Sequence, residues 1–209
     1  MQHDFILLDR SGSMVSRWDE AVNSINSYVA KLAEDKVDTG VTLVAFDNGT
    51  HGNLDFHIVR DRIIPSTWRK VSHTEVTPRN GTPLNDATAR IVSLAEAGGY
   101  DKLAIIIMTD GEENASKEYP GYKGREQIRA MLDRCREKNW QVIFLGANFD
   151  NALQASSYGA ARGQTISASA GTMGQHVNSI ARKRATYATG QSATMDWSDE
   201  EKAELNKKD

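Results

Sequence analysis

Phe5-Ile-Leu-Leu-Asp9-Arg-Ser11-Gly-Ser13 is an apolar run that ends in three oxygen-bearing side chains, placed at every second position. Four consecutive apolar residues are typical of a strand that is buried on both faces. Residues two apart in an extended chain point the same way, so Asp9, Ser11 and Ser13 are expected to converge where the strand leads into a helix. Helix capping is the alternative for this segment taken alone, because Asp and Ser are common at helix starts.

Apolar runs and amphipathic stretches alternate along the rest of the chain. Apolar runs predict strands at 41–46, 102–108 and 140–145, a hairpin partner at 54–59 and a short strand near 165–167. Helical spacing predicts helices over 18–32, 84–95, 128–135 and 173–187, and shorter helical pieces at 151–157 and within 65–83. Apolar strands separated by helices predict an α/β fold, with a doubly wound parallel sheet covered by helices on both faces.

Composition narrows the class of protein. The chain has 209 residues, of which 39% are hydrophobic and 25% charged, and this is typical of one globular domain. A net charge of -3 gives no electrostatic reason to expect nucleic-acid binding. No apolar run approaches the roughly 20 residues that span a bilayer, and no leader precedes the first strand, so we expect a cytoplasmic protein without membrane contact. The single cysteine, Cys135, is expected to be a buried thiol.

A change in composition near residue 190 divides the chain. Residues 1–189 are expected to form the single domain, and residues 190–209 a polar, charged tail. We expect this tail to be solvated or disordered. The alternative is a short charged helix, because Ser198-Asp-Glu-Glu201 reads as a capping box.

Two further oxygen-bearing segments follow far downstream of Ser13. Thr82 lies in Gly81-Thr-Pro-Leu84, and Asp110 follows the most apolar predicted strand. Ligands of open parallel sheets bind outside the carboxyl ends of the strands, which is where Asp9 and Asp110 are expected. Carboxylates, hydroxyls and water suit Mg²⁺, with Mn²⁺ or Ca²⁺ as possible alternatives, rather than zinc or copper. Two carboxylates neutralise a divalent ion, and an open coordination position would then attract the carboxylate of another molecule.

These segments together resemble a known family. Asp9-Arg-Ser11-Gly-Ser13, Thr82 and Asp110-Gly are similar to the Asp-x-Ser-x-Ser, Thr and Asp elements of the metal-ion-dependent adhesion site (MIDAS) of von Willebrand factor A domains. The similarity extends from about residue 4 to about residue 187 and looks closest to compact bacterial and phage members. It implies a Rossmann-like, mostly parallel sheet with one antiparallel strand at 54–59. It also implies direct or near-direct metal ligation by the three hydroxyls, often water-mediated binding by the two aspartates, and a partner's acidic group that completes the shell.

Several residues outside this set are weaker candidates for partner contacts. Asp47 follows a predicted strand and could lie at the same edge, although a turn residue is the more ordinary interpretation. Glu112 could shape partner preference, or could form a solvated charge pair with its neighbour. Trp68 and Trp197 could anchor a partner, as exposed aromatic residues often do. The basic cluster Arg182-Lys-Arg184 favours a solvated helix face over a binding site.

These observations favour a metal-dependent protein-binding module inside a bacterial cell or a phage-infected host. Many intracellular relatives work beside MoxR-type AAA+ ATPases or in larger assemblies. This chain lacks a Gly-x-x-x-x-Gly-Lys-Ser/Thr loop, so any ATPase would be a separate polypeptide. A metal-dependent hydrolase or phosphatase is one alternative, but the chain shows neither an Asp-x-Asp pair at Asp9 nor a Ser-His-Asp signature. A nucleic-acid-associated protein is the other, and the acidic charge balance disfavours it.

Overall fold

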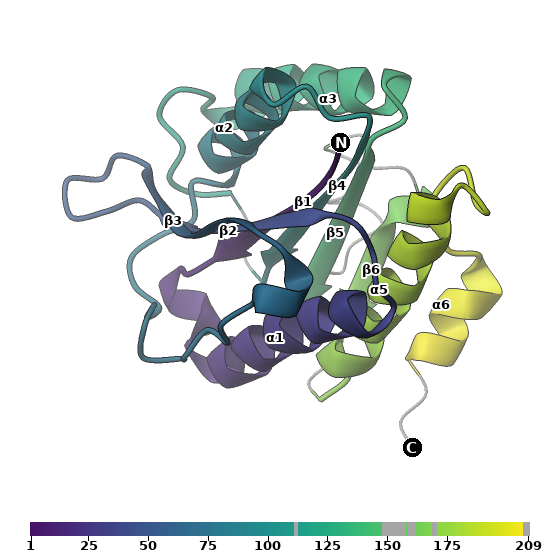
Figure 1. Cartoon of the computed structure of the whole chain (residues 1–209). Helices are drawn as coiled ribbons and strands as arrows, with labels where there is room; N and C mark the ends of the chain where they lie inside the picture. Colours follow the sequence, from purple (N-terminus) through teal and green to yellow (C-terminus); the bar gives the residue numbers. More distant parts are fainter. Residues whose placement is uncertain (111–112, 148–157, 159–161, 169–170, 207–209) are drawn as a thin grey trace.

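A single mixed sheet lies between two layers of helices (Figure 1). The computed structural model describes residues 1–110, 113–147, 158, 162–168 and 171–206. The sheet has six strands in the order β3-β2-β1-β4-β5-β6. Their bounds are β1 Gln2–Asp9, β2 Gly40–Asp47, β3 Asp55–Ile63, β4 Lys102–Thr109, β5 Gln141–Ala147 and β6 Thr165–Ala168. All neighbours pair in parallel except β3, which pairs antiparallel with β2. The predicted fold class and its one antiparallel strand are therefore confirmed.

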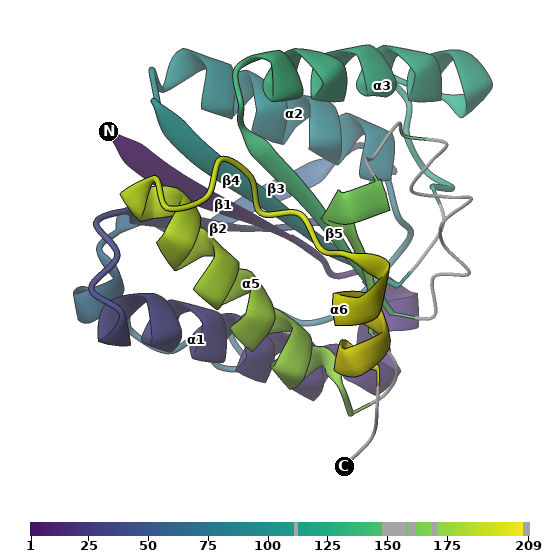
Figure 2. The same ribbon diagram turned by 90° about the vertical axis from the view of Figure 1, so that its right-hand side faces the viewer.

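The helices divide between the two faces of the sheet (Figures 1 and 2). The α-helices are α1 Trp18–Glu34, α2 Leu84–Ala97, α3 Gly121–Glu137, α5 Met173–Thr189 and α6 Asp199–Leu205. Short 3-10 helices are η1 Gly12–Arg17, η2 Pro65–Thr67 and η3 Arg162–Gln164. One hydrophobic core joins α1 and α5 to the sheet, and the second joins α2 and α3 to the opposite face. Figure 2 shows α6 packed along the outer side of α5.

Strand β1 shows why the continuous apolar run is needed. Ile6 and Leu8 belong to the core under α1 and α5, whereas Phe5 and Leu7 belong to the core under α2 and α3. Alternate residues of a strand face opposite sides of the sheet, so the stretch Phe5 to Leu8, which both helix layers cover, is apolar at successive positions. The parallel neighbours β2 and β4 lie on either side of β1, and their carboxyl ends therefore share one edge with Asp9.

Element bounds differ from the predicted ones where local signals are weak. Helix α3 begins at Gly121, several residues before the apolar spacing that predicted it, because its first two turns are mostly polar. Strand β3 extends to Ile63, beyond the predicted 54–59, and its pairing with β2 is irregular near Leu43. The helix predicted at 151–157 lies outside the described residues. No helix in the described part of the chain is both long enough and apolar enough to cross a bilayer.

The segment after α5 contributes to the core. Helix α5 ends at Gly190, whose φ of +78° is the left-handed conformation that favours glycine at this position. Met195 and Trp197 then pack into the core under α1 and α5, and the Trp197 side chain is only 3% exposed. The expectations of a wholly solvated tail and of Trp197 as a partner anchor are therefore wrong. The capping box of Ser198 and Glu201 is present, and it begins α6.

A buried ion pair connects α5 to the central strand. Arg184 is fully buried, and its Nε donates to Asp4 Oδ1 on β1 at 2.5 Å. Tyr28 on α1 donates its hydroxyl to the other Asp4 oxygen at 2.9 Å. The interpretation of Arg184 as part of a solvated basic face is therefore wrong. Cys135 is buried as predicted, and burial raises the pKa of its thiol to about 11.

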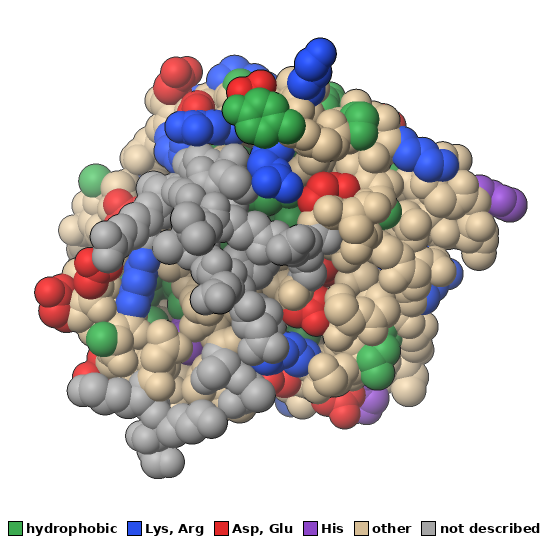
Figure 3. All heavy atoms as spheres, turned by 180° about the vertical axis from the view of Figure 1, so that it is seen from behind, with side chains coloured by type: hydrophobic (Ala, Val, Ile, Leu, Met, Phe, Trp, Pro, Cys, Tyr) green, Lys and Arg blue, Asp and Glu red, His purple; other side chains and the backbone are tan. Residues whose placement is uncertain are grey.

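Charged side chains of both signs are interspersed on the face shown in Figure 3. Among the described residues on that face, no basic patch is continuous over several elements. A stripe of Lys and Arg along one face is the usual electrostatic footprint of nucleic-acid binding. This view gives no support to that alternative.

Candidate metal centre

Asp9 lies at the centre of the carboxyl edge of the sheet. Its carboxylate is fully buried, and it accepts hydrogen bonds from the Ser11 backbone N–H at 2.7 Å and from the Thr109 hydroxyl at 2.6 Å. Burial raises the pKa of Asp9 to about 6, although both hydrogen bonds oppose that rise. Thr109 is the last residue of β4, so this contact connects the ends of two neighbouring strands. The side chain is thus fixed in orientation by two donors.

Ser13 connects the first segment to Asp110. The Ser13 hydroxyl donates to Asp110 Oδ1 at 2.8 Å. The hydroxyl oxygens of Ser11 and Ser13 are 3.0 Å apart. Ser13 is exposed and Asp110 is half-buried, so this side of the cluster faces the solvent. A hydroxyl that gives its hydrogen to a carboxylate keeps its oxygen lone pairs available for a cation. The Ser13 hydroxyl therefore lies on the solvent side of the cluster beside Asp110, whereas Ser11 and Asp9 are buried behind it.

Backbone hydrogen bonds hold the Thr82 segment against the first loop. The Gly12 N–H donates to the Asn80 carbonyl at 3.0 Å, and the Arg79 N–H donates to the Arg10 carbonyl at 2.7 Å. Asn80 itself has a φ of +59°, a conformation that Asn tolerates better than most residues. Thr82 follows two residues later and is almost completely buried. The loop carrying Thr82 thus lies alongside the loop carrying Ser11 and Ser13.

A buried charge network supports this pairing from beneath. Asp47, at the end of β2, is 0% exposed and accepts from Arg79 Nε at 2.6 Å and from Asn80 Nδ2 at 3.2 Å. Arg10 contacts Asp47 at 3.4 Å and Asp55 at 2.9 Å, and Arg79 also pairs with Asp55. Both arginines belong to the two paired loops. The network therefore holds the Thr82 loop and the Ser11 loop on the end of β2.

The loop after β4 is held on the first turn of α2. Glu113 accepts hydrogen bonds from the backbone N–H groups of Asn85 and Ser116, each at 2.7 Å. Asp86 accepts from the three successive N–H groups of residues 117–119, at 2.8, 3.3 and 2.9 Å. Two carboxylates at a helix N-terminus are favoured by the helix dipole as well as by these donors. They fix the loop that begins at Asp110.

Asn114 completes the contact between that loop and Thr82. The Thr82 N–H donates to Asn114 Oδ1 at 2.8 Å, and the Asn114 N–H donates back to the Thr82 carbonyl at 3.1 Å. A Cβ added to Gly81 would approach the same Asn114 oxygen to 3.0 Å, so this position fits only glycine well. The three predicted segments are therefore joined to one another by direct hydrogen bonds.

The donor set fits a hard divalent cation. It combines two carboxylates, Asp9 and Asp110, with the hydroxyls of Ser11, Ser13 and Thr82, and oxygen ligands of this kind suit Mg²⁺, Mn²⁺ or Ca²⁺. Among the described residues, no group of three or more His, Cys, Asp and Glu side chains could hold a metal ion. That is consistent with a site built largely from hydroxyls. A cation held here would depend on neutral oxygens and water for most of its shell.

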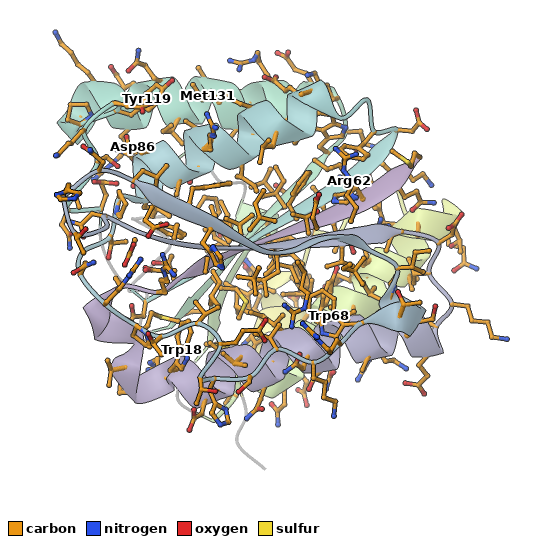
Figure 4. All side chains as sticks on the ribbon, turned by 60° about the vertical axis from the view of Figure 1, so that its left-hand side comes forward. Trp18, Arg62, Trp68, Asp86, Tyr119 and Met131 are labelled. Atoms are coloured by element: carbon orange, nitrogen blue, oxygen red, sulfur yellow. The ribbon has the colours of Figure 1, made fainter. Side chains whose placement is uncertain are left out.

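The weaker predicted residues have different positions. We call the carboxyl edge of the sheet that carries Asp9, Ser13 and Asp110 the metal edge. Asp47 lies at this edge but is buried beneath its surface, so it supports the site and presents no surface to a partner. Trp68 is half-buried, packs against the core under α1 and donates to Asn26 at 3.1 Å. In Figure 4, Trp68 lies along α1, away from the end of the molecule at which Trp18 and Asp86 lie. Glu112 lies outside the described residues.

Sequence reasoning missed the residues that hold the loops together. Asn114, Glu113 and Asp86 accept hydrogen bonds from backbone N–H groups at the site, and the Asn80 side chain donates to Asp47. The one local signal was the position of Asp86 in the first turn of a predicted helix, where carboxylates are common. Nothing local identified the other three, because their partners come from distant segments.

Comparison with protein families identifies one match. A family model described as von Willebrand factor type A domain matches residues 5–187, which is most of the chain. A comparison with curated protein sequences finds no match of significance. The matched range includes every residue of the predicted metal set.

Solved structures with similar folds come from several proteins. A mutant of the PilB minor pilin from Streptococcus sanguinis is 11% identical with a TM-score of 0.64, over 91% of this chain and 63% of the pilin. BatB from Bacteroides thetaiotaomicron is 16% identical with a TM-score of 0.56, over 91% of this chain and 100% of BatB. Manganese-loaded TRAP from Plasmodium vivax is 14% identical with a TM-score of 0.54, over 85% of this chain and 70% of TRAP. The chain thus spans less than two thirds of the pilin, and these similarities show a shared fold.

Proposed function

The chain belongs to the von Willebrand factor type A domain family, and we propose that it is a protein-binding module in which a divalent cation bridges to a carboxylate of the partner. The observation that carries this proposal is the hydrogen-bonded connection of Ser11, Ser13 and Asp110, in which Ser13 is exposed and Asp110 half-buried, while Ser11 and Asp9 are buried behind them. The residues of the cluster would hold the cation from one side. The open side is where a partner would reach it.

Charge counting supports a carboxylate as the partner group. Asp9 and Asp110 together neutralise a divalent cation, and the hydroxyls of Ser11, Ser13 and Thr82 add no further charge. A cation with so few anionic ligands retains a strong attraction for an external anion. An acidic side chain supplies such an anion and would bind with charge complementarity.

Mg²⁺ is the cation that we propose, with Mn²⁺ and Ca²⁺ as alternatives. Magnesium keeps several waters and needs few direct protein ligands, which suits a site with two carboxylates. TRAP, which has a similar fold, is described as manganese-loaded. That description supports the proposal of a divalent cation for a chain of this fold.

We propose binding rather than catalysis. The serine hydroxyls at the site hydrogen-bond to each other and to Asp110, and no described histidine hydrogen-bonds to either of them. Nucleophilic serine catalysis usually uses a histidine as the base that takes the hydroxyl proton, and a carboxylate such as Asp110 is a much weaker base. Our proposal includes an intracellular setting in a bacterial cell or a phage-infected host, with an AAA+ ATPase of the MoxR type as one possible partner.

Metal-dependent capture of partners tests this function. Immobilised protein would be exposed to a cell extract in Mg²⁺ or in chelator, alongside Ser13→Ala and the matched control Ser16→Ala. Ser16 is also an exposed serine of η1, three residues after Ser13 in the sequence. We expect a partner that binds the wild type and Ser16→Ala in Mg²⁺, and that is lost with chelator or with Ser13→Ala. Equal capture in chelator would contradict the proposal.

A further inference from the structure

A pocket of about 410 Å³ lies beside the metal edge, on the face of the sheet covered by α2 and α3. Its walls come from the β2–β3 hairpin, helix α2 and the loop after β4. Leu54, Phe56 and Tyr119 form its apolar part, and each is only partly buried against the core. The volume lies in the range of typical ligand pockets, and most of the residues that line this pocket are polar or charged. Figure 4 shows Asp86 and Tyr119 at this end of the molecule.

Among the residues that the structure describes, two cations of the pocket have no carboxylate partner. The described contacts of Lys117 Nζ are with neutral oxygens, Asn53 Oδ1 at 3.2 Å and the His51 carbonyl at 3.4 Å. Arg90 is exposed on α2, and within the described part of the chain it makes no ion pair. A cation held by neutral acceptors keeps its full charge available to a ligand. The pocket therefore offers two positive charges next to an apolar surface.

The pocket wall that carries Lys117 is held in position by hydrogen bonds before any ligand binds. Asp86, which is almost completely buried, accepts the backbone N–H groups of residues 117–119. Those donors and the N-terminus of α2 compensate the negative charge of Asp86, so it opposes an incoming anion weakly. A preformed wall lowers the entropic cost of binding.

The same segments form the pocket and hold the metal site. The hairpin supplies Asn53 to the pocket, and its Asn48 accepts the Gly81 N–H at 2.8 Å. Helix α2 begins two residues after Thr82, and the loop that supplies Lys117 also supplies Asn114 to Thr82. One partner surface that covers the metal edge would therefore also cover the mouth of this pocket.

We propose that this pocket binds a second acidic side chain, flanked by an apolar residue, of the same partner whose carboxylate reaches the metal. The inference rests on the proposed function, because it assigns one carboxylate to the cation and another to Arg90 and Lys117. The apolar neighbour would pack on Leu54, Phe56 and Tyr119. The pocket would thus select among acidic partners by the spacing of two carboxylates.

Glu118 allows a test in which one substitution should strengthen peptide binding while others weaken it. It lines the pocket, is exposed and carries a negative charge that would repel an acidic ligand. Removal of that charge by Glu118→Gln should therefore strengthen binding, whereas Arg90→Gln and Lys117→Gln should weaken it. A variant that merely disturbed the fold would not produce effects of opposite sign.

The probe is a set of fluorescent peptides with two glutamates, one next to leucine. Spacers of roughly two to five glycines would vary their separation, each residue adding about 3.5 Å of reach. Fluorescence anisotropy in Mg²⁺ would report affinity for the wild type and the three pocket variants. Arg69→Gln and Lys70→Gln are the matched controls, because these exposed cations lie in the loop that packs against α1. The singly charged peptide with one glutamate replaced by glutamine is the reference.

We expect one spacer length to bind best, with about three- to tenfold loss in Arg90→Gln and Lys117→Gln and a gain in Glu118→Gln. The controls should match the wild type. If the doubly acidic peptides need Mg²⁺ and Ser13 but show no dependence on Arg90 or Lys117, the pocket proposal is wrong and the metal function stands. Equal binding in Mg²⁺ and in chelator, or no binding in either, would overturn both the pocket proposal and the metal function.

Discussion

Ser13 donates its hydroxyl hydrogen to Asp110 at 2.8 Å, across 97 residues of sequence. This contact joins the loop after β1 to the loop after β4, and it lies where the two parallel strands end side by side. Ser13 accepts a hydrogen bond from the Ser11 hydroxyl, so its oxygen keeps one lone pair for a cation, and Asp110 keeps a second carboxylate oxygen. The pair therefore offers two kinds of oxygen to a cation at the solvent-facing side of the site.

Asp47→Asn should weaken both the fold and the metal site. Asp47 is buried and balances Arg10 and Arg79, so loss of its charge leaves two guanidinium groups poorly compensated. We expect a loss of about 2 to 4 kcal/mol in the free energy of unfolding, measured by urea denaturation in chelator. Because the network holds the Thr82 loop, Mn²⁺ affinity measured by calorimetry should fall about tenfold. Asp38→Asn, at an exposed position, is the control, and an equal effect there would refute this role.

Asp4→Ala should be strongly destabilising. It would leave Arg184 buried without its carboxylate and would remove the acceptor of the Tyr28 hydroxyl. Removal of one partner of a buried pair costs about 3 to 5 kcal/mol. Glu34→Ala breaks an exposed pair with Lys31 instead and should have a much smaller effect on stability. Similar losses in the two variants, measured by urea unfolding, would show that burial of the Asp4 pair has no such effect.

Trp197→Ala tests whether the segment after α5 is part of the domain. The indole is buried, donates to the Ser179 hydroxyl at 2.8 Å and lies in the core under α1 and α5. Truncation should cost about 3 to 5 kcal/mol, seen as a lower melting temperature. Tyr122→Ala removes a side chain that is 74% exposed and should change stability by no more than about 0.5 kcal/mol. An unchanged melting temperature in Trp197→Ala would mean that the segment is dispensable.

His3 should make the fold sensitive to acid. Burial lowers the pKa of His3 from 6.5 to about 4, so the unfolded chain binds a proton at a higher pH than the folded chain does. The stability associated with neutral His3 is complete above pH 6.5 and is lost as the pH falls from 6.5 to 4. Between pH 7.5 and 4.5 this corresponds to about 2 to 3 kcal/mol.

Urea unfolding of His3→Gln measures this contribution. The variant removes the titrating ring and should show a smaller loss of stability over the same pH range. The quantity to compare is the change in the free energy of unfolding with pH. The absolute stability will also differ, because His3 contacts Thr42 at 2.9 Å and stacks on Tyr100. Identical slopes in the two proteins would contradict the assignment to His3.

The sheet could be predicted from sequence because the burial of each strand determines its pattern of apolar residues. Strands β1, β2, β4 and β5 are covered on both faces, and this requires the continuous apolar runs that marked them. The polar first turns of α3 carry no such signal, so its start was placed too late. Met195 and Trp197 were misread for a related reason: two apolar residues in a polar segment do not reveal that both reach the core.

The candidate site was predictable only in part. Asp9, Ser11 and Ser13 lie close together in sequence, so their spacing showed that they could converge. The roles of Asp47, Glu113 and Asn114 depend on contacts with segments about 30 residues away, such as Asp47 with Arg79 and Asn114 with Thr82. Arg184 was misassigned because a helical pattern shows only which residues are polar. It does not show that a buried acidic partner, Asp4 on β1, pairs with Arg184.

Water-proton relaxation with Mn²⁺ tests most directly whether the site holds a cation with a position open to a carboxylate. Bound Mn²⁺ should enhance the relaxation rate of water protons, and added acetate should reduce that enhancement by displacing water from the metal. We expect both effects in the wild type and in Ser16→Ala. Both should be absent when Ser11→Ala and Asp110→Ala are combined. Enhancement that persists in the combined variant, or that acetate leaves unchanged in the wild type, would contradict the account.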